Sequence, residues 1–326
     1  MKNRDSDYIC LSAILRAKEA KLLSRARLEQ MLTEPGFADA CHIAAAAGYE
    51  DMSGMTVQGV NEALAAHRAA EYEDLSSMIP DKSVMEFYRL RYDYHNAKVL
   101  VKSGGDAKKN ASMFSAACRY GVDELLEAYA ADDVYFGALP ETFARAIREA
   151  KQALARTNNP QLADFVLDRA QYREELRAAE ALGKPFFLEF ARNRIDRANL
   201  CSTLRTAGLS KRAELLQQAL LEGGHVDPAD ILAAMDSREE LSRLFSATIF
   251  REAAAAPDMT AFEKAAENAQ RDFLMNGNYV NFGPEVVIEY LAALENEILS
   301  LRVILTGKLM RIDADTLRER LRESYV

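Results

Sequence analysis

The sequence has few of the residues that interrupt helices or staple small folds together. Only 15 of its 326 residues are glycine and only 8 are proline, so long stretches carry neither helix breaker. The four cysteines are widely scattered and form no C-x-x-C pair: Cys10, Cys41, Cys118 and Cys201. This pattern argues against a disulfide framework and indicates buried thiols in a reducing cytoplasm.

Long apolar runs and an excess of positive charge are also missing. No window approaches the roughly 18 uninterrupted apolar residues of a transmembrane helix, and the amino terminus lacks the apolar core of a signal peptide. The formal net charge of −9 argues against nucleic acid, because proteins that bind it carry a basic patch or stripe. We therefore expect a soluble protein that neither spans a membrane nor binds DNA or RNA.

Common catalytic and cofactor-binding motifs are absent as well. The sequence contains neither glycine-rich phosphate loop, G-x-x-x-x-G-K-[ST] or G-x-G-x-x-G, and it contains no H-E-x-x-H. Its one Glu-x-x-His match, Glu222 to His225, encloses a glycine pair and has no second copy, whereas di-iron bundles use two. No two of the four histidines have the spacing of metal ligands. We therefore expect no catalytic residue, no cofactor and no metal.

What the sequence does contain is a segment that recurs about every 100 residues. Its three copies begin at Asp93, Asp196 and Glu297. Each copy has an acidic residue, a small polar residue three positions later, and then a mixed apolar and basic run. Each copy is followed at nearly the same offset by a glycine, in turn Gly104, Gly208 and Gly307. A repeat of this length sets the architecture of the chain.

The repeat and the composition together predict an all-α fold. The sequence is rich in helix-favouring residues, and no stretch alternates for long enough to indicate a strand. Long helices are predicted over 83–102, 186–206 and 285–306, each closed by the glycine of its copy, and 7–32 is also predicted to be helical. We expect three similar units of about 100 residues around a pseudo-threefold axis, with a gently curved open array as the alternative. Their predicted bounds are 1–92, 93–195 and 196–326, the last including terminal closing helices.

The repeated acid and its polar neighbour are the candidate site. The pairs are Asp93 with Asn96, Asp196 with Asn199, and Glu297 with Ser300. Residues three apart share one face of a helix. Two interpretations stay open: the pairs fix the register of packed helices through hydrogen bonds, or they form a partner surface presented three times.

A second candidate is the most basic segment of the chain, near its amino terminus. Its cations are Arg16, Lys18, Lys21, Arg25 and Arg27. They are interpreted either as a solvated helix face or as a docking strip for an acidic partner.

The three copies resemble the C subunit of the V-type ATP synthases, whose counterpart in the eukaryotic vacuolar enzyme is the d subunit. The resemblance rests on 92–100, 195–200 and 297–309 and extends over nearly the whole chain. The third copy departs from the pattern, with Glu297 for aspartate and Ser300 for asparagine.

The resemblance implies a funnel-shaped, all-helical protein without catalytic residues. Such a subunit is part of the central stalk, or rotor, and sits on the cytoplasmic face of the membrane rotor ring. It receives the foot of the central shaft and transmits torque between ATP synthesis or hydrolysis and ion transport. We therefore expect a peripheral component of the complex that is a monomer when isolated. The alternatives are a helical-repeat adaptor unrelated to rotary ATPases and, more weakly, an all-helical enzyme with an unrecognised site.

Overall fold

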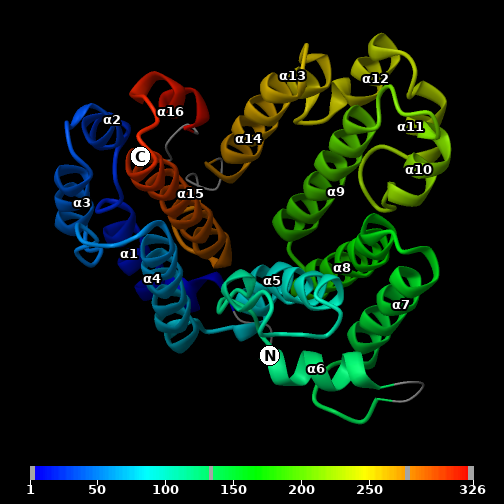
Figure 1. The fold of residues 1–326 in the computed structure, drawn as a ribbon, viewed down its shortest axis with the longest axis horizontal. Coiled ribbons are helices and arrows are strands. Elements are labelled where there is room, and N and C mark those ends of the chain that lie inside the picture. Colours follow the sequence, from blue (N-terminus) through cyan, green and yellow to red (C-terminus); the bar gives the residue numbers. More distant parts are fainter. Residues whose placement is uncertain (1–3, 132–134, 276–279, 322–326) are drawn as a thin grey trace. The chain divides into compact units, whose positions relative to one another are not determined.

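The computed structural model describes residues 4–131, 135–275 and 280–321. Over these residues the chain forms sixteen α-helices and three short 3-10 helices and has no strand, which confirms the all-α prediction (Figure 1). The chain divides into two compact units, one of residues 1–82 together with 267–326 and one of residues 83–266. The boundaries predicted after 92 and 195 fall inside two of the helices. The division into three repeats around an axis stays a prediction.

The first unit is built from both ends of the chain. Its elements are η1 (Asp5–Tyr8), α1 (Ile9–Glu19), α2 (Arg25–Thr33), α3 (Phe37–Ala46), α4 (Val57–Met78), α15 (Pro284–Leu309) and α16 (Ala314–Arg320). Helix α15 packs against α1, α2, α3, α4 and α16, and Figure 1 shows it among the amino-terminal helices. The successive residues Val286, Val287 and Ile288 point in different directions around α15, yet all three are fully buried. A helix that is apolar on all sides belongs in the middle of a core.

Two details of this unit differ from the sequence prediction. The helical segment predicted over 7–32 is interrupted between Glu19 and Arg25, so that α1 and α2 are separate helices. Helix α15 continues past Gly307 to Leu309 instead of ending at that glycine. A Cβ at Gly307 would lie 2.3 Å from a methyl carbon of Leu317 in α16. Gly307 therefore serves the close packing of α16, whereas Gly104 and Gly208 end their helices with φ of 70° and 82°, as predicted.

The second unit is continuous in sequence. Its helices are α5 (Lys82–Lys102), α6 (Val122–Ala130), α7 (Glu141–Thr157), α8 (Pro160–Leu182), α9 (Pro185–Arg205), α10 (Arg212–Ala219), α11 (Pro228–Ala234), α12 (Arg238–Leu244) and α13 (Arg251–Ala255), with the short η2 (Ala111–Met113) and η3 (Phe245–Ala247). Helix α5 begins at the last residue of the first unit, and α14 (Met259–Met275) starts in the second unit and continues into the first. Proline occupies the first position of α8, α9 and α15, where its missing N–H leaves no helical hydrogen bond unmade.

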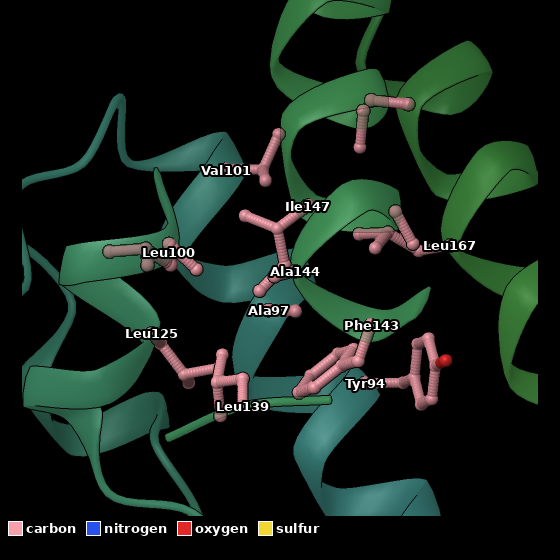
Figure 2. Packing of buried hydrophobic residues seen from close by; sticks show 14 of the residues in the cluster. Tyr94, Ala97, Leu100, Val101, Leu125, Leu139, Phe143, Ala144, Ile147 and Leu167 are labelled. Atoms are coloured by element: carbon pink, nitrogen blue, oxygen red, sulfur yellow. The ribbon is translucent and has the colours of Figure 1, made fainter. Parts of the chain in front are cut away.

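One core of the second unit lies where α5, α6, α7 and α8 meet (Figure 2). Helix α7 contributes Phe143 and Ile147, which are one turn apart, and the ring centroids of Phe143 and Tyr94 lie 4.6 Å apart. Leu125 from α6 and Leu167 from α8 belong to the same cluster, and all five of these residues are buried. Burying an aliphatic or phenyl side chain contributes roughly 1.5–3 kcal/mol each. Helix α5, which carries the first polar pair, is packed into this core through Leu90, Tyr94 and Ala97.

Candidate functional site: polar clamps on the long helices

The pair on α5 holds an irregular stretch of its own chain. The Asn96 side chain accepts a hydrogen bond from the Ser115 N–H at 2.8 Å and donates one to the Ser115 carbonyl at 3.0 Å. Four residues further on, the Asp93 carboxylate accepts from the backbone N–H of Arg119 at 2.6 Å and from its guanidinium Nε. Asp93 and Asn96 have no exposed surface. Together they satisfy backbone groups of a segment that has no regular partner, and we call this arrangement the Asp93 clamp.

The pair on α9 repeats this arrangement. The Asn199 side chain donates to the Leu221 carbonyl and accepts from the Leu221 N–H, both at 2.8 Å. Again four residues further on, the Asp196 carboxylate accepts from the backbone N–H of His225 at 2.9 Å and is joined to its Nδ1 at 2.7 Å. The Val226 N–H also donates to Asp196, at 3.3 Å. This is the Asp196 clamp, and its acid and amide are fully buried.

The pair on α15 departs from this pattern in the way its residue types suggest. Glu297 is buried and accepts hydrogen bonds from the Leu23 N–H and from the Tyr49 hydroxyl, the latter at 2.7 Å. Both partners lie far earlier in the sequence, in the amino-terminal part of the first unit. Ser300 is 2% exposed, and among the described residues its hydroxyl has no hydrogen-bond partner. The third copy thus keeps the acidic contact and lacks the amide contact.

All six predicted residues are buried, with exposed fractions of 0 to 6%. In this structure the carboxylates and amides bond to the chain itself, which is the geometry of packing and register. A contact of these residues with a partner protein stays a prediction.

The predicted basic strip divides into two parts. Arg16 lies 2.8 Å from Glu19 and 2.9 Å from Glu289, and Lys18 lies 2.8 Å from both Glu71 and Asp74. These two cations connect α1 to other helices of the first unit. The remaining three are exposed: Lys21, Arg25 and Arg27. Only this second part is accessible as a docking surface.

Burial dominates the electrostatics of the clamps. Desolvation raises the pKa of Asp93, and the nearby Arg119 offsets this only in part. Desolvation likewise raises the pKa of Asp196 against the hydrogen bonds from His225. Burial alone would lower the pKa of His225, but its contacts with Asp196 and Glu189 outweigh burial and raise it. Protonated His225 is therefore favoured between the two carboxylates.

The residues that the clamps grip, above all Arg119 and His225, were not predicted from the sequence. One signal was present in the glycine pair before His225. A Cβ at Gly224 would lie 2.2 Å from a carboxylate oxygen of Asp196, and Gly223 has a φ of 96°. The glycines are there because the backbone passes directly over a buried carboxylate. A glycine pair near a repeated acid is thus a sign of close backbone approach.

Two other kinds of site are missing from the described residues. No group of three or more histidine, cysteine, aspartate or glutamate side chains there is arranged to hold a metal ion. Within the same residues, no helix is long and apolar enough to cross a lipid bilayer.

Fold and site together define a class: an all-helical protein whose long helices carry repeated buried acids that hold its own backbone. Comparison with known proteins gives the family. The chain belongs to the ATP synthase (C/AC39) subunit family, whose model matches residues 11–320. It is also 24% identical, over 331 aligned residues, to the C subunit of the V-type sodium ATPase of Enterococcus hirae. That alignment covers 98% of this chain and 99% of the relative. The resemblance inferred from the three copies is confirmed.

Proposed function

We propose that this protein is the non-catalytic central-stalk component of a V-type ATPase or ATP synthase, linking the central shaft to the membrane rotor ring. The observation that carries the proposal is the family match, which extends over nearly the whole chain. The full-length alignment with a protein named as part of a V-type sodium ATPase supports the same assignment. It speaks against the alternative of an adaptor unrelated to rotary ATPases.

The internal construction of each unit suits a part that carries load. A linker between two rotating parts must resist twisting, and buried hydrogen-bonded charges resist displacement because moving them leaves unpaired groups in a low dielectric. The Asp93 and Asp196 clamps and Glu297 tie irregular segments to long helices. A force applied to one of these irregular segments is therefore transmitted to the long helix that holds it.

The exposed part of the basic strip is our candidate docking surface for an acidic neighbour in the complex. Lys21, Arg25 and Arg27 are exposed, and they follow or lie within helices fixed to the core of the first unit. A cluster of exposed cations on a chain of net charge −9 steers an acidic partner toward one place. We propose that the protein docks on the inner, cytoplasmic face of the membrane as a peripheral part of the complex.

The test is to assemble the complex in vesicles with and without this protein and to measure ATP hydrolysis and ATP-driven ion uptake together. Uptake is followed for both sodium and protons. Without the protein, hydrolysis by the catalytic head should continue and uptake should be lost. Full uptake in vesicles that lack it would contradict the linker role.

A charge-removal variant then tests the docking strip. Lys21, Arg25 and Arg27 are changed together to glutamine. The matched control changes three exposed cations of the second unit to glutamine: Lys109, Arg205 and Lys211. The strip variant should assemble into the complex less well than the native protein at low salt, and this difference should shrink at higher salt, where the native attraction is screened too. The control should assemble normally. Equal loss in both variants would assign the effect to net charge and not to the strip.

A further inference from the structure

The second unit has a positively charged hollow that neither the clamps nor the proposed coupling role uses. It is an open depression of about 430 Å³ at the surface between α12 and α13, and it is lined by Arg238, Glu239, Ser242, Arg243, Ser246, Arg251 and Ala255. Three guanidinium groups face one carboxylate, although the chain as a whole is acidic. The hollow is therefore positively charged, whereas the chain as a whole carries a net negative charge.

The helix register builds this hollow. Glu239, Ser242, Arg243 and Ser246 recur at the spacing of one helix face along α12 and the turn after it. Arg251 and Ala255 lie one turn apart on α13, which packs against α12. The small side chain of Ala255 leaves the space open.

The cations of the hollow have few strong interactions with other groups of the protein. Arg238 donates to the Ala256 carbonyl at the end of α13, which ties the two helices together but neutralises no charge. Arg243 lies 3.3 Å from Glu239 in a pair whose side chains are 71% and 86% exposed. Such an exposed pair contributes little, because water and salt screen the attraction between its charges. Among the described residues, the Arg251 guanidinium and the Ser242 hydroxyl have no hydrogen-bond or ion-pair partner.

We infer that this hollow binds the phosphate group of a small ligand or of a lipid headgroup. Arginine presents two parallel N–H donors that match two phosphate oxygens, and a hydroxyl supplies a donor from another direction. Arg251 and Ser242 are the uncommitted donors, and Arg243 can exchange its solvent-exposed glutamate for the stronger anion. Arg238 forms part of the wall of the hollow. The volume lies in the range of small-molecule sites, which suits a phosphate-bearing molecule of modest size.

Inorganic phosphate is the first probe, added to the full-length protein at constant ionic strength with chloride as the balancing anion. Backbone amide signals of 238–255 are followed by NMR. We expect saturable shifts with phosphate and none with chloride alone. Arg251→Gln should weaken phosphate binding about tenfold, the loss expected for one charge-assisted hydrogen bond.

Arg205→Gln is the matched control, because it removes one exposed cation of the same unit that lies outside the hollow. It should bind phosphate like the native protein. Ser242→Ala provides a second variant that keeps all the charges and should weaken binding by a smaller factor. Phosphate binding unchanged in Arg251→Gln, or weakened equally in Arg205→Gln, would overturn the assignment.

Vesicle flotation distinguishes the two sources of phosphate. Vesicles of phosphatidylcholine are compared with vesicles that also contain phosphatidate. Flotation with phosphatidate that is lost in Arg251→Gln identifies a lipid headgroup as the ligand, whereas phosphate shifts without flotation identify a free phosphate compound. Shifts caused by a polyglutamate peptide but not by phosphate would refute a phosphate site and indicate an acidic protein segment instead.

Discussion

The clamps on α5 and α9 share one design and differ in one cation. In each, the amide holds one backbone residue and the aspartate holds the backbone four residues later. The side chain of that later residue bridges the aspartate to a second carboxylate. Arg119 reaches Glu174 at 2.8 Å, and His225 reaches Glu189 at 2.9 Å.

The two clamps differ in whether their cation stays charged as the pH changes. Arginine keeps its charge at every pH at which the protein folds, so the cation of the Asp93 clamp is always present. Histidine gains and loses its proton near neutrality, so the Asp196 clamp holds an ion pair only while His225 is protonated. A repeat can therefore keep its geometry while one copy becomes sensitive to pH. Because both clamps lie in the second unit, their variants can be compared on the same unfolding transition.

The largest effect is expected from removing the aspartate of the permanent clamp. Asp93→Ala leaves the Arg119 guanidinium half-buried beside an empty place and leaves its N–H unpaired. We expect a loss of about 3–5 kcal/mol in the free energy of unfolding, measured with urea. Asp196→Ala should cost less, about 2–3 kcal/mol, because His225 can release its proton and become neutral. Equal losses would show that the identity of the cation is unimportant.

The amides should be the common part of the two clamps. Asn96→Ala and Asn199→Ala each leave a backbone N–H and a carbonyl without their partner. Each should lower the free energy of unfolding by about 2–3 kcal/mol, and by the same amount at acid and neutral pH. A large difference between the two variants in urea unfolding would break the equivalence of the copies.

The pH dependence should separate the clamps directly. The pKa of His225 is raised in the folded protein, so its contribution is complete below the unfolded pKa of about 6.5 and is lost as pH rises through the folded pKa. His225→Gln should therefore reduce stability by about 1 kcal/mol at mildly acid pH and less at alkaline pH.

Other groups also titrate in this range. Burial raises the pKa of Glu289 to about 7, so its contribution also falls as pH rises. Subtracting the unfolding curve of His225→Gln from that of the native protein removes such shared contributions. A difference between the two that does not vary with pH would contradict a titrating clamp.

The smallest effect is expected in the third copy, which has Ser300 where the other two copies have asparagine. Ser300→Ala removes a buried hydroxyl that has no hydrogen-bond partner among the described residues, so stability should stay unchanged or rise by up to about 1 kcal/mol. Ser12→Ala, in the same unit, is the control, because its hydroxyl accepts from the Gly283 N–H. That control should be destabilised. Destabilisation of Ser300→Ala in thermal unfolding would show that the third copy keeps an amide-like contact.

The sequence was sufficient for the three long helices, apart from the end of the last one, and for the paired polar positions. It was insufficient for the groups that those positions bind. Helices follow local periodicity, so the spacing of Asp93 and Asn96 alone placed them on one face. Their partners lie in irregular segments, where no period marks which backbone group is left unpaired. Glu297 shows the limit most clearly, because its partners Leu23 and Tyr49 precede it by more than 200 residues. The repeated pattern within α15 does not indicate which distant segment of the chain packs beside Glu297.

The glycine after the third copy shows the same limit in another form. Gly104 and Gly307 stand at similar offsets, yet one has a left-handed backbone and the other lies within a helix. Glycine permits a turn, and it equally permits close packing. The choice is made by Leu317, whose side chain occupies the space where a Cβ would be.

The composition of the first unit has a consequence for synthesis on the ribosome. Helices α1 to α4 are made early, but α15, which supplies much of their shared core, is made only after the whole second unit. The second unit is continuous, so it can fold while translation proceeds. Until α15 has been made, Leu15, Leu28 and Leu64 of the amino-terminal helices lack part of the core that buries them in the folded protein. The nascent chain is therefore most in need of a chaperone at its oldest end, until Glu297 arrives to bind Leu23 and Tyr49.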